Sequence, residues 1–328
     1  MRLATILPEN ATVPLAAVSV DKDRFVGLHD FLNFFGSKDL PESQAAPLEQ
    51  FLPAVMPRLS EFTRKLSDWP EHEKVFQKRG GKSFRAQKFL PPIVRPSTFR
   101  DFYAFEQHVR TSRGRRGRDM VQAWYEIPVF YFSNPNSLVA DDETVSAPAN
   151  SQELDYELEL GVVIGKRGKD IAPAKAWEHV AGFTIINDFS ARDLQRAEME
   201  VGLGPAKGKD FATAVGPMLI TRDQVSDKIS GDKISLDMRA RVNGRELSRG
   251  NCSALHHSFP KMIAHASRDA ELFPGDLIGS GTVGTGCIWE LGPENTGGWL
   301  KPDDVVELEV ERLGVLRTRI IGRKTSAG

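Results

Sequence analysis

The fold of this chain of 328 residues is decided by the stretch ELDYELELGVVIG, residues 153–165. Polar and apolar side chains alternate along it, which is typical of a half-buried β-strand. Asp155, Glu157 and Glu159 share one face of that strand, because side chains two positions apart point the same way. Taken alone, such a face is more typical of a solvated surface than of a site. Parallel carboxylates repel each other unless a cation lies between them, however, so a cation site is the competing interpretation.

A second segment strengthens the case for a cation site. AGFTIIND, residues 181–188, is predicted to be an apolar strand that ends at Asp188. SARDLQRAEM, residues 190–199, is predicted to be a helix with Ser190 as its N-cap. Side chains that follow a strand are often presented to ligands. Three carboxylates without cysteine or clustered histidine favour a hard cation such as Mg²⁺, Mn²⁺ or Ca²⁺.

The rest of the chain indicates an α+β protein that is mainly β. Residues 3–35 contain short β-like runs, and residues 48–66 have the apolar spacing of helices. Three prolines between positions 91 and 96 predict an extended connector, so we place a domain boundary near residue 90. We therefore expect a β-rich N-terminal domain with a helical connector over 1–90, and a larger domain over 91–328. Alternating βαβ units are not evident, which argues against a doubly wound sheet.

Charge and hydropathy exclude several classes of protein. The chain has 43 Lys and Arg against 44 Asp and Glu, whereas proteins that bind nucleic acid or membrane surfaces carry a basic surplus. No apolar run approaches the ~18 residues of a membrane span, and residues 8–10 interrupt any signal-like stretch. The two cysteines are interpreted as buried apolar residues of a reducing compartment. We expect a cytoplasmic protein without nucleic-acid or membrane partners.

Two further patterns are ambiguous. GSGTVG, residues 279–284, matches a dinucleotide-binding pattern, but residues 285–289 after it predict a strand, so a glycine-rich bend is favoured. The run RTSRGRRGRD, residues 110–119, is compatible with a flexible loop, a lid over an anionic substrate, or a nucleic-acid patch. The loop is favoured, and the lid is preferred to nucleic acid because no aromatic residue is interleaved with the arginines.

Three segments in the same order resemble the fumarylacetoacetate hydrolase family. They are ELDYELELGVVIG, INDFSARDLQ (residues 186–195) and LFPGDLIGSGT (residues 272–282). DFYAFEQH, residues 101–108, is similar to the fumarylacetoacetase-like sub-type. The resemblance extends from about residue 90 to 322. It implies a catalytic domain built as a mixed β-sheet roll or barrel, preceded by a small β-rich domain, and a homodimer.

The resemblance also assigns roles to individual residues of this chain. The implied metal ligands are Asp101, Glu157, Glu159 and Asp188. The implied general base is His108, oriented by Glu290. The implied groups that stabilise the oxyanion and the departing carbanion are Arg192, Gln195 and Lys209. The implied substrate contacts are Tyr103, Arg116, Tyr131 and Thr282.

These assignments imply a metal-dependent hydrolase that cleaves the C–C bond of a 2,4-diketo acid. The substrate would be a small anion similar to fumarylacetoacetate or an acylpyruvate, in aromatic or amino-acid catabolism, and the cofactor Mg²⁺ or Ca²⁺, with Mn²⁺ a further option. A cation that chelates a 1,3-dicarbonyl stabilises its enolate, and an oriented histidine activates water. Two alternatives stay open. One is a lyase of the same fold, either a 2-hydroxy-dienoate hydratase or a 2-keto acid decarboxylase, and the other is a metal-stabilised binding protein without turnover.

Overall fold

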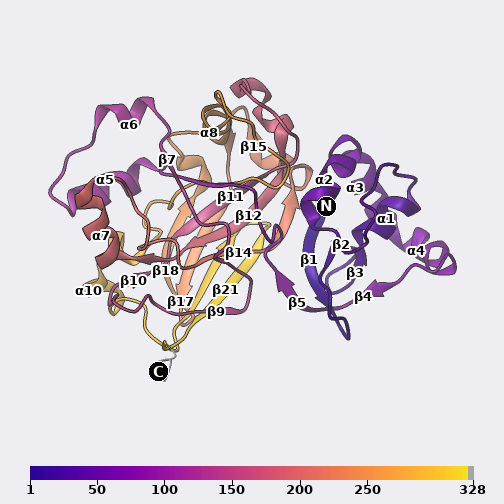
Figure 1. Ribbon diagram of the computed structural model, residues 1–328, viewed down its shortest axis with the longest axis horizontal. Helices are drawn as coiled ribbons and strands as arrows, with labels where there is room; N and C mark the ends of the chain where they lie inside the picture. The colour runs from indigo at the N-terminus through magenta and orange to yellow at the C-terminus, as the bar shows by residue number, and fades with distance from the viewer. Residues whose placement is uncertain (324–328) are drawn as a thin grey trace.

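The computed structural model describes residues 1–323, and its first 90 residues form one end of the molecule (Figure 1). The strands of this part are β1 (Arg2–Pro8), β2 (Leu15–Ser19), β3 (Phe25–Gly27), β4 (Ser83–Phe84) and β5 (Ala86–Leu90). The helices are α1 (Leu28–Phe34), α2 (Leu48–Val55), α3 (Leu59–Ser67) and α4 (Trp69–Lys78), with a short 3-10 turn, η1 (Met56–Arg58). The helical spacing of residues 48–66 thus corresponds to α2, η1 and α3.

The rest of the chain alternates short helices with strands. Its first half contains β6 (Phe99–Phe102), α5 (Glu106–Gly114), α6 (Gln122–Glu126), β7 (Phe130–Phe132), β8 (Leu138–Val139), β9 (Glu143–Val145), β10 (Leu154–Asp155), β11 (Leu158–Ile164), η2 (Pro173–His179), β12 (Val180–Asp188), β13 (Ser190–Ala191), α7 (Arg192–Val201) and β14 (Thr213–Thr221). Its second half contains η3 (Arg222–Lys228), β15 (Ile229–Ser230), β16 (Lys233–Ile234), β17 (Asp237–Val242), β18 (Arg245–Asn251), η4 (Cys252–Ala254), α8 (Phe259–Ala266), β19 (Leu277–Gly279), α9 (Ile288–Leu291), α10 (Pro293–Thr296), β20 (Val305–Val310) and β21 (Gly314–Ile320). None of the helices in residues 1–323 is long and apolar enough to cross a membrane.

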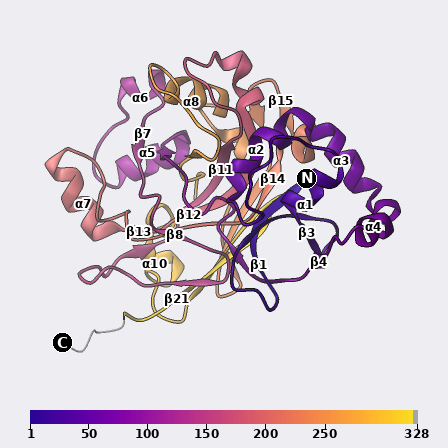
Figure 2. The same cartoon turned by 45° about the vertical axis from the view of Figure 1, so that its right-hand side comes forward.

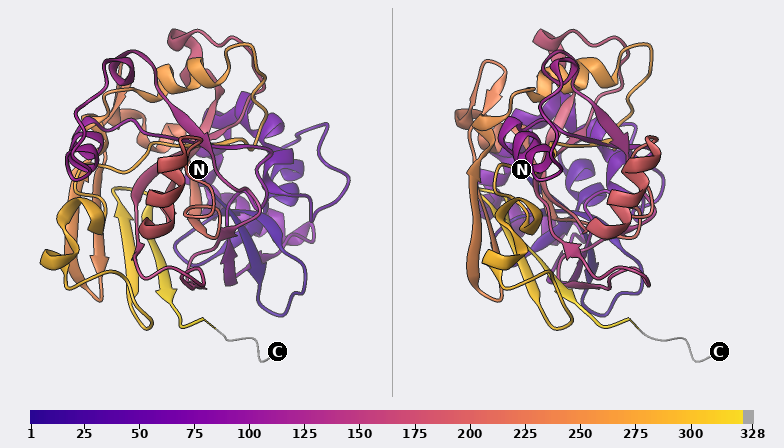
Figure 3. Two further views of the ribbon diagram at one scale, coloured as in Figure 1. Left: turned by 60° about the vertical axis from the view of Figure 1, so that its left-hand side comes forward. Right: turned by 90° about the vertical axis from the view of Figure 1, so that its left-hand side faces the viewer.

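Two large sheets enclose the main core. The larger is mixed and runs in the order β4-β3-β2-β1-β14-β12-β11-β19-β6-β7, with β5 paired to β1 and β8 to β14. The second runs in the order β18-β17-β20-β21-β9, and its orange and yellow strands lie side by side in both views of Figure 3. Apolar side chains of β11 and β12 pack against those of β17, β20 and β21. Over the described residues the larger sheet stays open, so the roll of the predicted α+β fold is observed without barrel closure.

The N-terminal region is joined to the larger sheet by backbone pairing. β1 runs antiparallel to β14, with Leu3 opposite Leu219. A second core cluster contains Phe31 and Phe51 from the N-terminal helices together with Val163 of β11 and Leu219 of β14. Figure 2 shows these helices lying over β1 and β3. The boundary near residue 90 stays a prediction, and residues 324–328 of the predicted domain 91–328 lie outside the described residues.

Three local predictions were wrong for identifiable reasons. β11 is buried along its whole length rather than half-buried, because apolar clusters cover both of its faces. Ser190 is not the N-cap of α7: it pairs with Asp155 in a short β-ladder, and its hydroxyl donates to the carbonyl oxygen of Asp188 at 3.0 Å. The segment after the glycine run forms helix α9 instead of a strand, because the backbone N–H groups of Ile288 and Trp289 donate to the buried Asp155 carboxylate.

Candidate active site

Three carboxylates from three strands of the larger sheet meet in the interior. Asp101 of β6, Glu159 of β11 and Asp188 of β12 each offer an oxygen, and these oxygens lie within 4.8 Å of one another. β19 lies between β6 and β11, and its last residue, Gly279, is opposite Asp101. A Cβ atom at Gly279 would lie 2.2 Å from Asp101 Oδ1 and 3.0 Å from Glu159 Oε2. Glycine is therefore the residue that leaves room for these carboxylates to approach each other.

The electrostatics of this cluster fit a divalent cation. Asp101 Oδ1 and Glu159 Oε1 are buried and find no hydrogen-bond partner among residues 1–323. Burial raises the pKa of both carboxyl groups well above its ordinary value, and the neighbouring carboxylates raise it further. A hard cation would neutralise these charges and satisfy the unpaired oxygens. The residues present therefore suit a metal of the Mg²⁺, Mn²⁺ or Ca²⁺ type.

Glu157, the fourth predicted ligand, is held by cationic side chains. Its Oε1 accepts from Arg192 at 2.7 Å, and its Oε2 accepts from Lys209, which also donates to Asp188 Oδ2 at 2.7 Å. Burial alone would raise the pKa of Glu157, but Lys209 and Arg192 hold it below its ordinary value. Glu157 is thus placed beside the cluster as an ionised carboxylate, and its role as a metal ligand stays a prediction.

His108 and Glu290 form a buried pair beside the carboxylates. His108 Nδ1 on α5 lies 2.9 Å from Glu290 Oε2 on α9, and both side chains are at most 5% exposed. The ring of Tyr103 packs edge-on against the imidazole at 5.4 Å. When Nδ1 carries the proton and donates it to the carboxylate, Nε2 retains a lone pair. The arrangement can therefore act as an oriented base.

Asp155 is a functional candidate that is not among the predicted metal ligands or catalytic residues. Its Oδ2 accepts from Arg192 Nε at 2.8 Å, while the backbone N–H groups of Ile288 and Trp289 donate to it at 2.7 and 3.0 Å. This carboxylate joins the start of α7 to the start of α9. It thereby places Arg192 and Glu290 relative to each other. The only feature of the sequence that pointed to Asp155 was its position among the acidic residues that alternate with apolar ones in residues 153–165.

One cavity of about 270 Å³ unites the predicted residues. Of the predicted site residues it is lined by Asp101, Tyr103, His108, Arg116, Tyr131, Glu157, Glu159, Asp188, Arg192, Gln195, Lys209 and Thr282. Glu290 lies behind His108 and is not in the lining. Tyr131 donates its hydroxyl to Asp188 Oδ2 at 2.7 Å, and Arg192 donates to Gln195 Oε1 at 3.0 Å. Met199 and Pro205 add apolar surface to the lining.

The arginine-rich run forms part of the cavity wall. Its first half is helical, since α5 continues to Gly114, so the interpretation of the whole run as a loop was wrong. Arg113, Arg116 and Arg118 line the cavity. The guanidinium of Arg116 lies 6.0 Å from the ring centre of Trp289, and its Nε is buried without a hydrogen-bond partner in the described part of the chain. The run therefore directs positive charge at the same space as the carboxylates.

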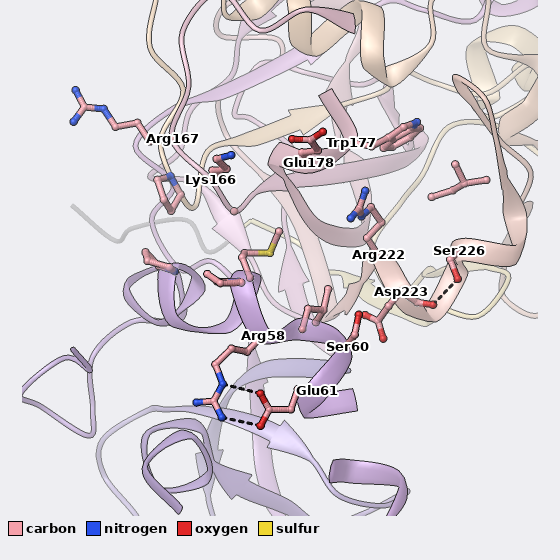
Figure 4. A pocket seen from close by; sticks show the side chains of 17 residues that line it. Arg58, Ser60, Glu61, Lys166, Arg167, Trp177, Glu178, Arg222, Asp223 and Ser226 are labelled. Carbon is pink, nitrogen blue, oxygen red and sulfur yellow. Dashed lines mark hydrogen bonds and ion pairs between the residues drawn. The ribbon is translucent and has the colours of Figure 1, made fainter. Parts of the chain in front are cut away.

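A larger cavity of about 1080 Å³ lies between the N-terminal helices and the main body (Figure 4). Arg58 and Glu61 pair on its lower wall, and Trp177 and Arg222 lie on the opposite wall (Figure 4). None of the predicted site residues lines it. Size therefore does not identify the chemical site here, whereas converging charged groups do.

The family follows from comparison with known proteins. The sequence model described as fumarylacetoacetate (FAA) hydrolase C-terminal matches residues 97–321. The chain belongs to the fumarylacetoacetate hydrolase family. The resemblance seen in the sequence is thereby confirmed, and with it membership of a family of enzymes.

Relatives within the fumarylacetoacetate hydrolase family carry out different reactions. The mitochondrial oxaloacetate tautomerase FAHD2A of Homo sapiens is 36% identical over 196 residues, which are 59% of this chain and 59% of that protein. A probable 2-hydroxyhepta-2,4-diene-1,7-dioate isomerase from Mycobacterium abscessus has the same fold, with a TM-score of 0.68 and 24% identity over 99% of this chain and 100% of that one. Fumarylpyruvate hydrolase from Pseudomonas aeruginosa, solved with Mn²⁺ and pyruvate, gives a TM-score of 0.57 and 25% identity over 73% of this chain and 93% of that one. The family is therefore established, and the reaction has to be argued from the site.

Proposed function

We propose that this protein is a metal-dependent hydrolase that cleaves the C–C bond of a small 2,4-diketo acid. The observation that carries the proposal is the buried His108–Glu290 pair, 2.9 Å apart, with His108 in the wall of the cavity that also holds the carboxylate cluster. Hydrolysis needs a base that activates water beside a group that stabilises an enolate. Residues that could meet both requirements line one cavity.

The carboxylates Asp101, Glu159 and Asp188, with Glu157 beside them, would hold a divalent cation. When bound, Mg²⁺, Ca²⁺ or Mn²⁺ supplies Lewis-acid stabilisation to the enolate of a chelated dicarbonyl. The Mn²⁺ and pyruvate in the structure of fumarylpyruvate hydrolase support this use of the site. Arg116 would bind the carboxylate at the other end of the substrate, because its guanidinium lines the cavity and its buried Nε has no hydrogen-bond partner within residues 1–323.

His108 would take a proton from water at Nε2, while Glu290 keeps Nδ1 protonated. The resulting hydroxide adds to the carbonyl remote from the substrate carboxylate. The C–C bond then breaks, its electron pair passes into the enolate, and the proton on His108 returns to the enolate carbon. One diketo acid and one water thus give two acids or an acid and a keto acid.

Lys209 would stabilise the charge that develops on oxygen. Burial alone would lower its pKa, but Asp188 and Glu157 raise it above the ordinary value, so Lys209 remains an ammonium. Among the described residues, two of its three N–H groups donate to Glu157 and Asp188, and the third could donate to a substrate oxygen. Arg192 and Gln195 would extend this donor wall.

A second candidate is an enol–keto tautomerase, which the similarity to the human oxaloacetate tautomerase favours. The same His108 could move a proton between carbon and oxygen without adding water. The lyase alternatives, a hydratase or a decarboxylase, would use the same cation site. A binding protein without turnover would not need an oriented base, so the His108–Glu290 pair argues against that alternative.

The test is product analysis by mass after incubation with a panel of 2,4-diketo acids, 2-hydroxy-dienoates and oxaloacetate. Each substrate is assayed with Mg²⁺, with Mn²⁺ and with a chelator. Hydrolysis gives two products whose masses sum to substrate plus water, and it stops in the chelator. Ultraviolet absorbance is recorded in parallel, and an enzyme-dependent change in absorbance without any change in mass would replace the hydrolase with the tautomerase.

We also propose a cytoplasmic homodimer, although the name of the human relative places that protein in mitochondria.

A further inference from the structure

Cys287 lies directly beside the His108–Glu290 pair. Its Sγ is 3.9 Å from His108 Nδ1, and Cys287 and Glu290 are three positions apart across the start of α9, so both face α5. One donor atom from each of His108, Cys287 and Glu290 lies within 4.8 Å of the other two. This group thus combines nitrogen, sulfur and oxygen donors, whereas the carboxylate cluster offers oxygen alone.

The chemical types of these three donors suit a borderline-soft cation. Zinc takes His nitrogen at about 2.0 Å, thiolate sulfur at about 2.3 Å and carboxylate oxygen at about 2.0 Å in a tetrahedral arrangement, which places donors about 3.2–3.6 Å apart. The distances from His108 Nδ1 to Glu290 Oε2 and to Cys287 Sγ, 2.9 and 3.9 Å, lie on either side of that range.

Glu290 provides an independent observation. Its side chain is 2% exposed, and its second carboxylate oxygen, Oε1, is buried without a hydrogen-bond partner in residues 1–323. An orphaned carboxylate oxygen is costly in an apolar interior, and a bound cation would neutralise the group.

We propose that His108, Cys287 and Glu290 form a second cation site, which takes Zn²⁺ or another divalent ion with affinity for sulfur. Binding releases the thiol proton to solvent, and the imidazole proton moves from Nδ1 to Nε2 by exchange with water. Nε2 then has no lone pair with which to accept a proton. Zn²⁺ therefore switches off the base without displacing the hard cation, a consequence that rests on the proposed hydrolase.

The direct test is titration with Co²⁺ in excess Mg²⁺, followed by absorption. A thiolate ligand gives Co²⁺ a charge-transfer band that oxygen ligands do not give. We expect this band at one Co²⁺ per chain in the wild type and in Cys252→Ser, and its loss in Cys287→Ser. Cys252 is the matched control, because it is also buried but contacts Met238 Sδ at 3.3 Å. If Cys287→Ser alters the fold, Cys287→Ala repeats the comparison.

The outcomes separate this site from the proposed activity. No band in the wild type, or a band that persists in Cys287→Ser, overturns the site whatever the protein catalyses. Where turnover is measurable, the Zn²⁺ concentration that halves it, relative to each variant's own rate without Zn²⁺, should rise about 10- to 100-fold in Cys287→Ser and stay constant in Cys252→Ser. A band without turnover would retain the site and reject the hydrolase.

Discussion

A histidine acts as a base at neutral pH only if one ring nitrogen keeps a lone pair, and Glu290 determines which nitrogen of His108 that is. Replacing His108 with Gln removes the base while keeping a polar side chain of similar size. We expect kcat for the best diketo acid to fall about 10²- to 10⁴-fold, with Mg²⁺ affinity retained. His256→Gln is the control, since this histidine is exposed. Undiminished turnover in His108→Gln would exclude the mechanism.

Without the proposed cation, the buried carboxyl groups of Asp101 and Glu159 should make the folding stability of the protein depend on pH. Their pKa values are raised above the ordinary 3.8 and 4.5 in the metal-free fold, chiefly by burial. As the pH rises above these ordinary values, the folded state holds more protons than the unfolded state, so the metal-free protein loses stability. A cation that binds the ionised carboxylates stabilises the folded state and should therefore reverse this loss of stability.

The stabilisation by Mg²⁺ should therefore increase with pH. It is measured as the difference in Tm with Mg²⁺ and with a chelator at several pH values from about 5 to 8. Glu159→Gln should remove most of this difference, whereas the half-buried surface residue Glu309, changed to Gln, should leave it intact. A difference in Tm that is constant or falls with pH would contradict the cation site.

The role of a residue could be predicted from the sequence only where the residues next to it form a recognisable pattern. Glu159 and Asp188 were identifiable because their strands carry a recognisable pattern around them. Cys287 was read as a buried apolar residue, which its burial agrees with, but its proximity to His108 depends on two helices meeting. Asp155 lies in the stretch that was quoted for the fold, yet two of the groups that donate to its carboxylate are backbone N–H groups more than 130 positions away. Contacts of that kind leave no periodicity in the sequence.

At the scale of elements, α9 is held in place by Asp155. Asp155→Asn removes a charge buried against Arg192 and weakens the acceptor for two backbone N–H groups of α9. We expect unfolding free energy to fall by about 3–5 kcal/mol, measured in urea. Glu153→Gln, which breaks the partly exposed pair with Arg196, should cost at most about 1 kcal/mol. Equal losses in the two variants would show that Asp155 has no special role.

The arginine-rich segment, residues 110–119, leads to a different kind of prediction, because it lines the cavity and its proposed role is to bind substrate. Arg116→Ala should raise KM for a dianionic diketo acid about 10- to 100-fold and change kcat little, since it removes a charge-assisted hydrogen bond worth roughly 1.5–3 kcal/mol. Arg110→Ala is the control, because Arg110 is exposed and paired with Glu106. Steady-state kinetics distinguish the two. A fall in kcat at constant KM in Arg116→Ala would assign Arg116 to the chemical step.

At the scale of the molecule, composition and strand patterns were sufficient to predict the fold class. They did not predict how the first 90 residues pair with the larger sheet. The prolines between 91 and 96 predict an extended connector, and the residues between β5 and β6 instead form a series of bends that is neither helix nor strand. The pairing of β1 with β14, however, joins residues more than 200 positions apart. Pairing over such a separation depends on the complete three-dimensional arrangement, so a proline-rich connector could not reveal it.

That pairing leads to a prediction for the isolated segment 91–328. Deleting residues 1–90 removes the neighbour of β14 along Leu219 and Ile220 and uncovers the apolar side chains of Val163 and Ala181. Exposed strand edges and apolar patches promote association between chains. We therefore expect the segment to aggregate or to lack a cooperative thermal transition, as judged by light scattering and circular dichroism.

A point variant tests the same coupling without truncation. Phe51→Ala on α2 opens the shared core cluster and should cost about 3–5 kcal/mol. If the two regions unfold together, this loss also lowers the hydrogen-exchange protection of β12, which ends at Asp188 of the carboxylate cluster. Phe132→Ala is the control, because that side chain is 65% exposed. Unchanged protection of β12 in Phe51→Ala, together with cooperative folding of 91–328, would instead make the first 90 residues an independent domain. The active-site strands would then be stable without the helices that cover them.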